Sequence, residues 1–271
     1  MTAGSATLEA PGRSDVGRGR VFVALLWRDL FVTGREVWVF LAQVAIQPLF
    51  ILFVFAKVLG DLNFVSGSFS HVLLPGIVAL TAFLTALQTV ALPLVIEFGW
   101  TKEIEDRLLA PIPTPLVAVE KVVIAALRAL FAALLMIPAG ALILGHIPWR
   151  ASGLPLLVLV VVLGGWAAGA VGLILGTSVP PTRINIMFAL ILTPLLFTGA
   201  TQYPWPLLDR LRWFQVVTAL NPLTYCSEGV RAAMAPSIPH IAPWISVAVL
   251  AGASVVLTAI GMRGFQRRAI D

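Results

Sequence analysis

Two short blocks of this chain bring together side chains that could make specific polar contacts. The first, FGWTKEIEDRLLAPIP at positions 98–113, carries five charges in a chain that is only 11% charged. The charged residues are Lys102, Glu103, Glu105, Asp106 and Arg107. Most charge runs are solvated loops. The mixed signs here favour instead a rigid surface that receives force from a soluble partner.

Local signals predict a short helix in this first block. Thr101 is a suitable N-cap, and Glu103 stands in the first turn, where acidic side chains are favoured. Ile104 and Leu108 are four residues apart and share one face, which predicts a docking surface. Proline lacks the N–H donor and clashes with the preceding turn, so it stops a helix. The prolines that follow the block's helix are Pro111, Pro113 and Pro115.

The second block is LNPLTYCSEGVR, before the last apolar run. Asn221 is the expected N-cap of a short helix that has Pro222 at its first position. Glu228 and Arg231 are three residues apart and can pair on one helix face. A buried pair of this kind must be fully satisfied by its surroundings. We favour an ion pair that orients this segment over direct contact with a substrate.

No catalytic pattern is present in the sequence. None of the three Lys residues follows a Gly, so the phosphate-binding GxxxxGK[ST] loop is absent. The three His residues are isolated and Cys226 is the single cysteine, so neither a metal site nor a disulfide framework is predicted. We therefore expect a chain that is not an enzyme and that binds no cofactor and no metal itself.

The composition predicts an all-α integral membrane protein. The chain has 271 residues and is 59% hydrophobic. Several apolar runs reach the roughly 20 residues that cross a bilayer as a helix. We predict six spans, at 38–59, 72–96, 116–144, 154–177, 184–201 and 241–262.

The basic residues predict the orientation of these spans. Thirteen of the 18 Lys and Arg residues fall on the side that holds both termini and the first block, which makes that side cytoplasmic. The same rule accounts for the net charge of +5 without a nucleic acid partner. The second block then lies on the outer side, where prolines divide the chain into two short helices, at about 207–219 and 223–234.

The predicted domain organisation is one transmembrane domain between two tails. Residues 1–20 form a disordered cytoplasmic tail, 21–262 the membrane domain, and 263–271 a second cytoplasmic tail. The polar residues of positions 28–36 fall on one side of a helical wheel, which predicts an amphipathic helix in the membrane interface. A plain extension of the first span is the alternative.

A few polar or small residues interrupt the predicted spans. Polar groups in lipid need partners or a wet path, so they either line a pathway or bond neighbouring helices. The candidates are Gln43, Gln47, Gln88 and Asn185. The fourth span also contains two GxxxG motifs, at 165–169 and 172–176, which predict close helix packing.

The two blocks, in this order and spacing, resemble the permeases of the type-2 ATP-binding-cassette (ABC-2) family. EIEDRLLAPIP looks like the cytoplasmic loop between the second and third spans of that family. LNPLTYCSEGVR is similar to its signature of Asn-Pro-Leu-Thr-Tyr, an acidic residue and then Arg. Many members carry an Arg-Glu-Arg-Glu-Thr-Gly run where this chain has FGWTKE. The loop version EIEDRLLAPIPT looks like the daunorubicin-resistance and nodulation-exporter branch.

The resemblance implies roles for both blocks. Residues 102–108 would form the coupling helix that sits on an ATPase subunit, with the charged side chains in polar contacts and Ile104 and Leu108 docked or bracing the loop. The second block would belong to re-entrant helices that close the pathway on the outer side. Its signature positions are Asn221, Pro222, Tyr225, Glu228 and Arg231.

The resemblance also implies a function, a location and partners. The chain would be the permease subunit of an exporter of amphiphilic drugs, lipids or glycolipids in the bacterial plasma membrane. A separate ATPase subunit would bind ATP and Mg²⁺, and a second permease subunit would complete a homodimer surrounded by membrane lipids. A polysaccharide exporter of the same family, an ion-coupled secondary transporter and an assembly subunit without transport of its own are the alternatives.

Overall fold

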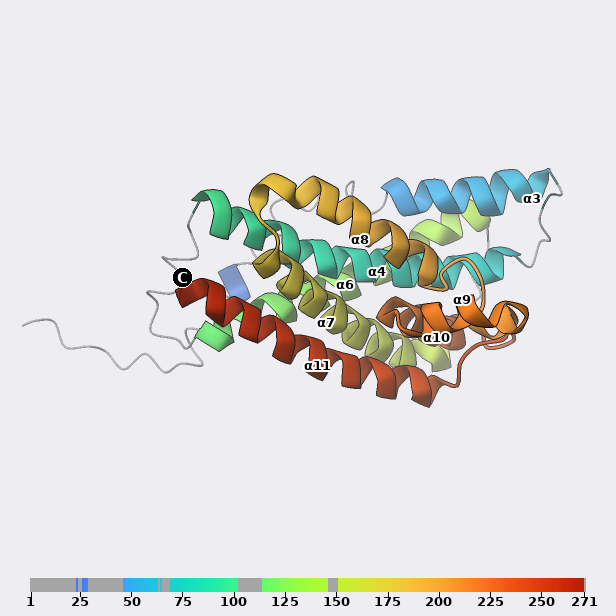
Figure 1. Cartoon of the computed structure of the whole chain (residues 1–271). Coiled ribbons are helices and arrows are strands. Elements are labelled where there is room, and N and C mark those ends of the chain that lie inside the picture. The colour runs from blue at the N-terminus through green and yellow to red at the C-terminus, as the bar shows by residue number, and fades with distance from the viewer. Residues whose placement is uncertain are drawn as a thin grey trace, which may run out of the picture.

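The computed structural model describes residues 23, 26–28, 46–62, 64, 69–101, 114–145 and 151–270. Within these residues the chain is helical and contains no strand. Four of the described helices are long and apolar enough to cross a membrane: α4 (Phe69–Ile96), α6 (Thr114–Leu144), α7 (Leu154–Ser178) and α11 (Pro243–Ile270). They form a bundle with the C-terminus of the chain at one end (Figure 1).

Shorter helical elements surround this bundle. They are η1 (Phe53–Val58), α3 (Leu59–Asp61), η2 (Glu97–Thr101), η3 (Ala151–Gly153), η4 (Pro181–Arg183), α8 (Ile184–Thr198), η5 (Trp205–Leu211), α9 (Arg212–Ala219) and α10 (Pro222–Met234). The two elements α9 and α10 lie at the end of the bundle opposite the C-terminus, and α8 runs along its outside (Figure 1).

The structure confirms four of the predicted spans as long apolar helices, namely α4, α6, α7 and α11. The fifth predicted span corresponds to α8, which has 15 residues. At 1.5 Å per residue it extends about 22 Å, less than a hydrocarbon core of about 30 Å. The first predicted span, 38–59, is described only from residue 46 onward. The count of six spans therefore stays a prediction.

The predicted boundaries of the membrane domain and its two tails stay predictions. The predicted tail at 263–271 is helical through Ile270, as the continuation of α11. The predicted tail at 1–20 and nearly all of the predicted interfacial helix lie outside the described residues. The two short helices expected before the last span are present as η5 with α9 and as α10.

Helix α7 lies in the middle of the bundle, against α4, α6, α10 and α11. The motif 165–169 faces α6, and a Cβ on its first glycine would lie 2.6 Å from the Cβ of Ala129. The motif 172–176 faces α4, and a Cβ on its first glycine would lie 2.6 Å from the carbonyl oxygen of Leu87. Each GxxxG motif thus brings α7 close to a different helix of the same chain.

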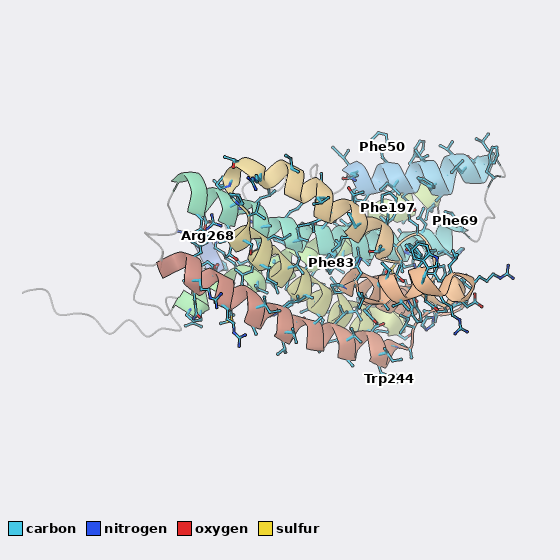
Figure 2. The ribbon with its side chains drawn as sticks, viewed as in Figure 1. Phe50, Phe69, Phe83, Phe197, Trp244 and Arg268 are labelled. Atoms are coloured by element: carbon cyan, nitrogen blue, oxygen red, sulfur yellow. The ribbon has the colours of Figure 1, made fainter. Side chains whose placement is uncertain are left out.

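The core of the bundle and its outward faces are both apolar. Phe83, halfway along α4, is fully buried, whereas Phe50, Phe197 and Trp244 are exposed (Figure 2). A soluble monomer rarely exposes so much apolar surface, but lipid covers it without cost. The outward faces therefore fit a protein embedded in a bilayer.

Candidate functional site

Helix α10 begins as the sequence predicts, with Asn221 as N-cap and Pro222 in the first turn. The Oδ1 atom of Asn221 accepts a hydrogen bond from the backbone N–H of Leu223 at 2.9 Å. Its Nδ2 donates to the carbonyl oxygen of Leu195 at 2.8 Å and to Thr198 Oγ1 at 2.9 Å. One side chain therefore both caps α10 and ties it to the C-terminal end of α8.

Two hydroxyl groups of α10 connect it to the preceding helix α9. Thr224 Oγ1 lies 2.6 Å from the carbonyl oxygen of Thr218, and Tyr225 Oη donates to the carbonyl oxygen of Ala219 at 3.0 Å. The last carbonyl groups of a helix have no partner within the helix itself. The side chains of α10 supply those partners and thereby fix the turn between α9 and α10.

The segment that follows α8 is held by α10 as well. Ser227 Oγ donates to the carbonyl oxygen of Gly199 at 2.6 Å, and Arg231 Nη2 donates to that of Ala200 at 2.9 Å. Ala200 has a φ of +50°, a left-handed conformation that costs a non-glycine residue about 1–2 kcal/mol. These two hydrogen bonds from α10 help to offset that cost.

The carboxylate of Glu228 joins three parts of the chain. Its Oε1 accepts a hydrogen bond from the backbone N–H of Trp205, at the start of η5, at 2.9 Å. Its Oε2 accepts from the backbone N–H of Ile241, just before α11, at 2.9 Å. Arg231 Nη1 donates to Oε1 of the same carboxylate. Both side chains of the pair are 0% exposed.

The energetics of this pair favour a positioning role. Burial raises the pKa of the Glu228 carboxyl, while Arg231 and the two backbone amides lower it. Removing two charges from water costs several kcal/mol, which offsets much of the attraction between them. The pair therefore serves to fix the positions of the segments that it joins more than to raise the free energy of unfolding. The structure places Glu228 and Arg231 in contact and away from any surface that a ligand could reach, whereas their role in transport stays a prediction.

A second buried ion pair lies at the other end of the bundle. Lys121 Nζ donates to Glu97 Oε1 at 2.9 Å. Glu97 is 7% exposed and Lys121 is 8% exposed. Glu97 opens η2, just before the charged loop at 102–113, and Lys121 lies in α6, just after that loop. The neighbouring Glu120 is 0% exposed. The sequence analysis missed Glu97 and Glu120, although each is a lone acidic residue at the edge of an apolar run.

At the same end of the bundle, side chains of α11 contact both η2 and the end of α7. The rings of Phe98 and Phe265 meet edge to face with their centroids 5.6 Å apart. The guanidinium of Arg268 lies 5.3 Å from the centroid of the Phe98 ring. Its Nη1 also donates to the carbonyl oxygen of Thr177 at 2.7 Å, at the end of α7. Figure 2 shows Arg268 at this end and Phe69 at the opposite one.

The remaining predicted site residues are spread over the chain. Residues 102–108, the predicted coupling helix, lie outside the described residues, and so does Gln43. Gln47 is exposed ahead of η1, and Gln88 is half-buried in α4. Asn185 lies in the first turn of α8, and its side chain is outside the described part. These positions belong to separate helices, so a shared pathway stays a prediction.

Cys226 is a packing residue in α10. It is fully buried, and a Cβ on Gly164 of α7 would lie 2.5 Å from its Sγ. Burial raises the pKa of the thiol to about 12, which makes it a poor nucleophile. Across the described part of the chain, no group of three or more His, Cys, Asp or Glu side chains could hold a metal ion.

Comparison with known proteins identifies a family. A family model described as ABC-2 type transporter matches residues 20–235. The inner membrane transport permease YadH of Escherichia coli K12 is 25% identical over 215 residues, which cover 76% of this chain and 80% of that protein. The permeases of the same name from E. coli O157:H7 and Shigella flexneri match with the same identity and coverage. No solved structure matches.

Proposed function

Because the chain belongs to the ABC-2 type transporter family, we propose that it is the transmembrane permease subunit of an ATP-driven exporter. A separate ATPase subunit binds ATP and Mg²⁺, and this chain supplies the membrane pathway. The cargo is an amphiphilic drug, lipid or glycolipid that leaves across the bacterial plasma membrane. The family match carries this proposal, because residues 20–235 include both the charged loop and α10.

Force from the ATPase subunit enters through the charged loop at 102–113. The loop begins at the end of η2 and leads into α6, and the Glu97–Lys121 ion pair ties these two elements together. A push on the loop therefore moves both helices as a unit. The contacts of Phe98 with Phe265 and Arg268 extend that unit to α11.

The orientation of the bundle follows from its charges. In the proposed arrangement the end with Arg263, Arg267 and Arg268 faces the cytoplasm, since basic residues are enriched on that side of a membrane. The opposite end, with η5, α9 and α10, then faces outward. There the hydrogen bonds of Glu228 hold η5 and the start of α11 together as an outer closure of the pathway.

A second permease subunit covers the exposed face of α8 in this proposal. Ile186, Leu190 and Phe197 are 72%, 66% and 61% exposed on that helix. A 15-residue helix too short to cross the bilayer alone gains from a protein neighbour. A Leu190→Cys variant should form a cross-linked dimer, because the single native Cys226 is buried and does not compete.

The coupling role is tested by reversing two charges in the loop. Glu105→Lys combined with Asp106→Lys should abolish transport and the stimulation of the ATPase while membrane insertion is unchanged. Asp209→Lys is a control, because Asp209 is exposed in η5, which packs against α9 at the other end of the bundle. Unchanged transport in the double variant would rule out coupling through this loop.

The ion-coupled secondary transporter is supported by one observation. Such a carrier needs ionisable groups inside its spans, and Glu97, Glu120 and Lys121 are buried in or at the ends of α4 and α6. The two functions differ in their energy source. Uphill transport by the purified chain alone, on a proton or sodium gradient, would establish the carrier, and dependence on an added ATPase subunit and ATP would establish the exporter.

A further inference from the structure

A pocket of about 650 Å³ lies at the end of the bundle opposite the C-terminus. Three segments form its walls: the start of α4, the chain at 202–207 and the chain at 237–239. Phe69, at the start of α4, marks its place in Figure 2. Pockets that take drug-sized ligands in proteins have volumes of about 300–1,000 Å³, so this one can hold a small molecule.

The lining of this pocket selects by charge. Its polar side chains are an imidazole, an amide, a phenol and a hydroxyl, from His71, Gln202, Tyr203 and Ser237. The other described lining residues are apolar, and within the part of the chain that the structure describes no Asp, Glu, Lys or Arg lines the pocket. A charged ligand would lose part of its hydration here and would meet no Asp, Glu, Lys or Arg among the described lining residues.

We propose that this pocket binds a neutral amphiphile, with an uncharged hydrogen-bonding head group against Gln202, Ser237 and the acceptor oxygen of Tyr203, whose hydroxyl donates to the carbonyl oxygen of Phe197, and an apolar tail against the apolar wall. This inference rests on the proposed function, because it takes the ligand of the pocket to be the exported molecule as it leaves on the outer side. The pocket then narrows the cargo class from amphiphiles in general to amphiphiles without net charge in the head group.

The walls of the pocket are held in place before a ligand arrives. Glu228 binds the backbone N–H of Trp205, which directly follows the wall at Pro204, and that of Ile241, two residues beyond the wall at Pro239. The same carboxylate thus fixes the distance between two of the three walls. A preformed pocket binds more tightly because less chain must be ordered on binding.

A thiol-protection experiment tests the site on the full-length chain in lipid nanodiscs. Ser237→Cys places a thiol in the pocket at an exposed position, and Cys226 is too buried to react. The probe is n-octyl β-D-glucoside, and the charged comparisons are octyl sulfate and octyltrimethylammonium, all below their critical micelle concentrations. At a glucoside concentration about four times its dissociation constant, the maleimide labelling rate should fall about fivefold. The charged probes should leave that rate unchanged.

Three further variants make the result specific to the pocket. Ala151→Cys places a thiol at an exposed position in η3, outside the pocket lining, and its labelling rate should not respond to the glucoside. Leu207→Trp, added to Ser237→Cys, fills the pocket from an exposed position and should abolish the protection. Gln202→Leu keeps the shape but removes the amide, and should weaken protection.

Each other outcome overturns the inference. No protection of Ser237→Cys by the glucoside would remove the site, and equal protection by all three probes would remove the charge selection. Protection that persists with Leu207→Trp and Gln202→Leu would place the bound molecule outside the pocket. The labelling assay needs neither ATP nor an ATPase subunit. It can therefore fail while the charge-reversal experiment at Glu105 and Asp106 still supports the exporter, and it can succeed while that experiment does not.

Discussion

Lys121 Nζ lies 2.9 Å from both carboxylate oxygens of Glu97, although the two residues are 24 positions apart. Between them in the sequence lies the charged segment 102–113, which is outside the described residues. The ion pair therefore joins the two described elements that flank this segment. Because both side chains are almost fully buried, the pair is shielded from salt and holds the ends of α4 and α6 at a fixed distance.

Breaking this pair should destabilise the protein and, if the proposed function is right, uncouple it from the proposed ATPase subunit. Lys121→Met removes one partner of this buried ion pair, and breaking a buried pair in this way typically costs about 3–5 kcal/mol. We expect a lower midpoint in thermal unfolding in detergent and a loss of cargo transport. The exchange Glu97→Lys with Lys121→Glu should recover part of both. A single variant as stable and active as the parent chain would show that the pair has no such role.

Changes at Glu228 should separate its charge from its hydrogen bonds. Glu228→Ala removes the acceptor of two backbone N–H groups and leaves the Arg231 guanidinium buried without the Glu228 carboxylate, at a cost of about 3–5 kcal/mol. Glu228→Gln keeps one acceptor oxygen and should lose less. Chemical unfolding in detergent gives the two values. If Glu228→Ala proves neutral for stability and transport, the pair with Arg231 is dispensable.

Two glycines in long helices should respond to alanine with opposite signs. A Cβ on Gly76 would lie 1.7 Å from the carbonyl oxygen of Thr201, so Gly76→Ala forces α4 away from that segment and should cost about 1–3 kcal/mol. Gly252 in α11 has nothing within 4 Å, and Gly252→Ala should stabilise its helix by about 0.5–1 kcal/mol. Unfolding midpoints of both variants, measured in one detergent, check the difference. Equal shifts would contradict the close approach at Gly76.

Two substitutions of Asn221 should separate its role as the N-cap of α10 from its role as a hydrogen-bond link to α8. Asn221→Ala loses both the cap on Leu223 and the donor to the carbonyl oxygen of Leu195. Loss of an N-cap alone costs about 0.5–2 kcal/mol. Asn221→Ser keeps a capping oxygen but is too short to reach α8, so its loss of stability should be smaller than that of alanine. A serine variant as unstable as alanine would assign the whole effect to the tether.

Features set by neighbouring residues could be predicted from the sequence. Unbroken apolar runs predicted the four long helices, because about 20 such residues satisfy both the bilayer and their own backbone groups. The order Asn221–Pro222 predicted where α10 begins, and the three-residue spacing of Glu228 and Arg231 predicted their contact. Each of these signals depends only on helix geometry, which a few adjacent positions determine.

Features that join distant segments were decided by the tertiary structure. Glu228 meets Trp205 and Ile241 through their backbone N–H groups, which every residue but proline possesses and which no side-chain pattern can mark. The pairing of Glu97 with Lys121 and the walls of the pocket beside Phe69 arise in the same way, from segments that are distant in the sequence but pack together. The sequence thus determined which segments are helices and which carry charge. Packing decided which charges meet, because that depends on the relative placement of whole helices.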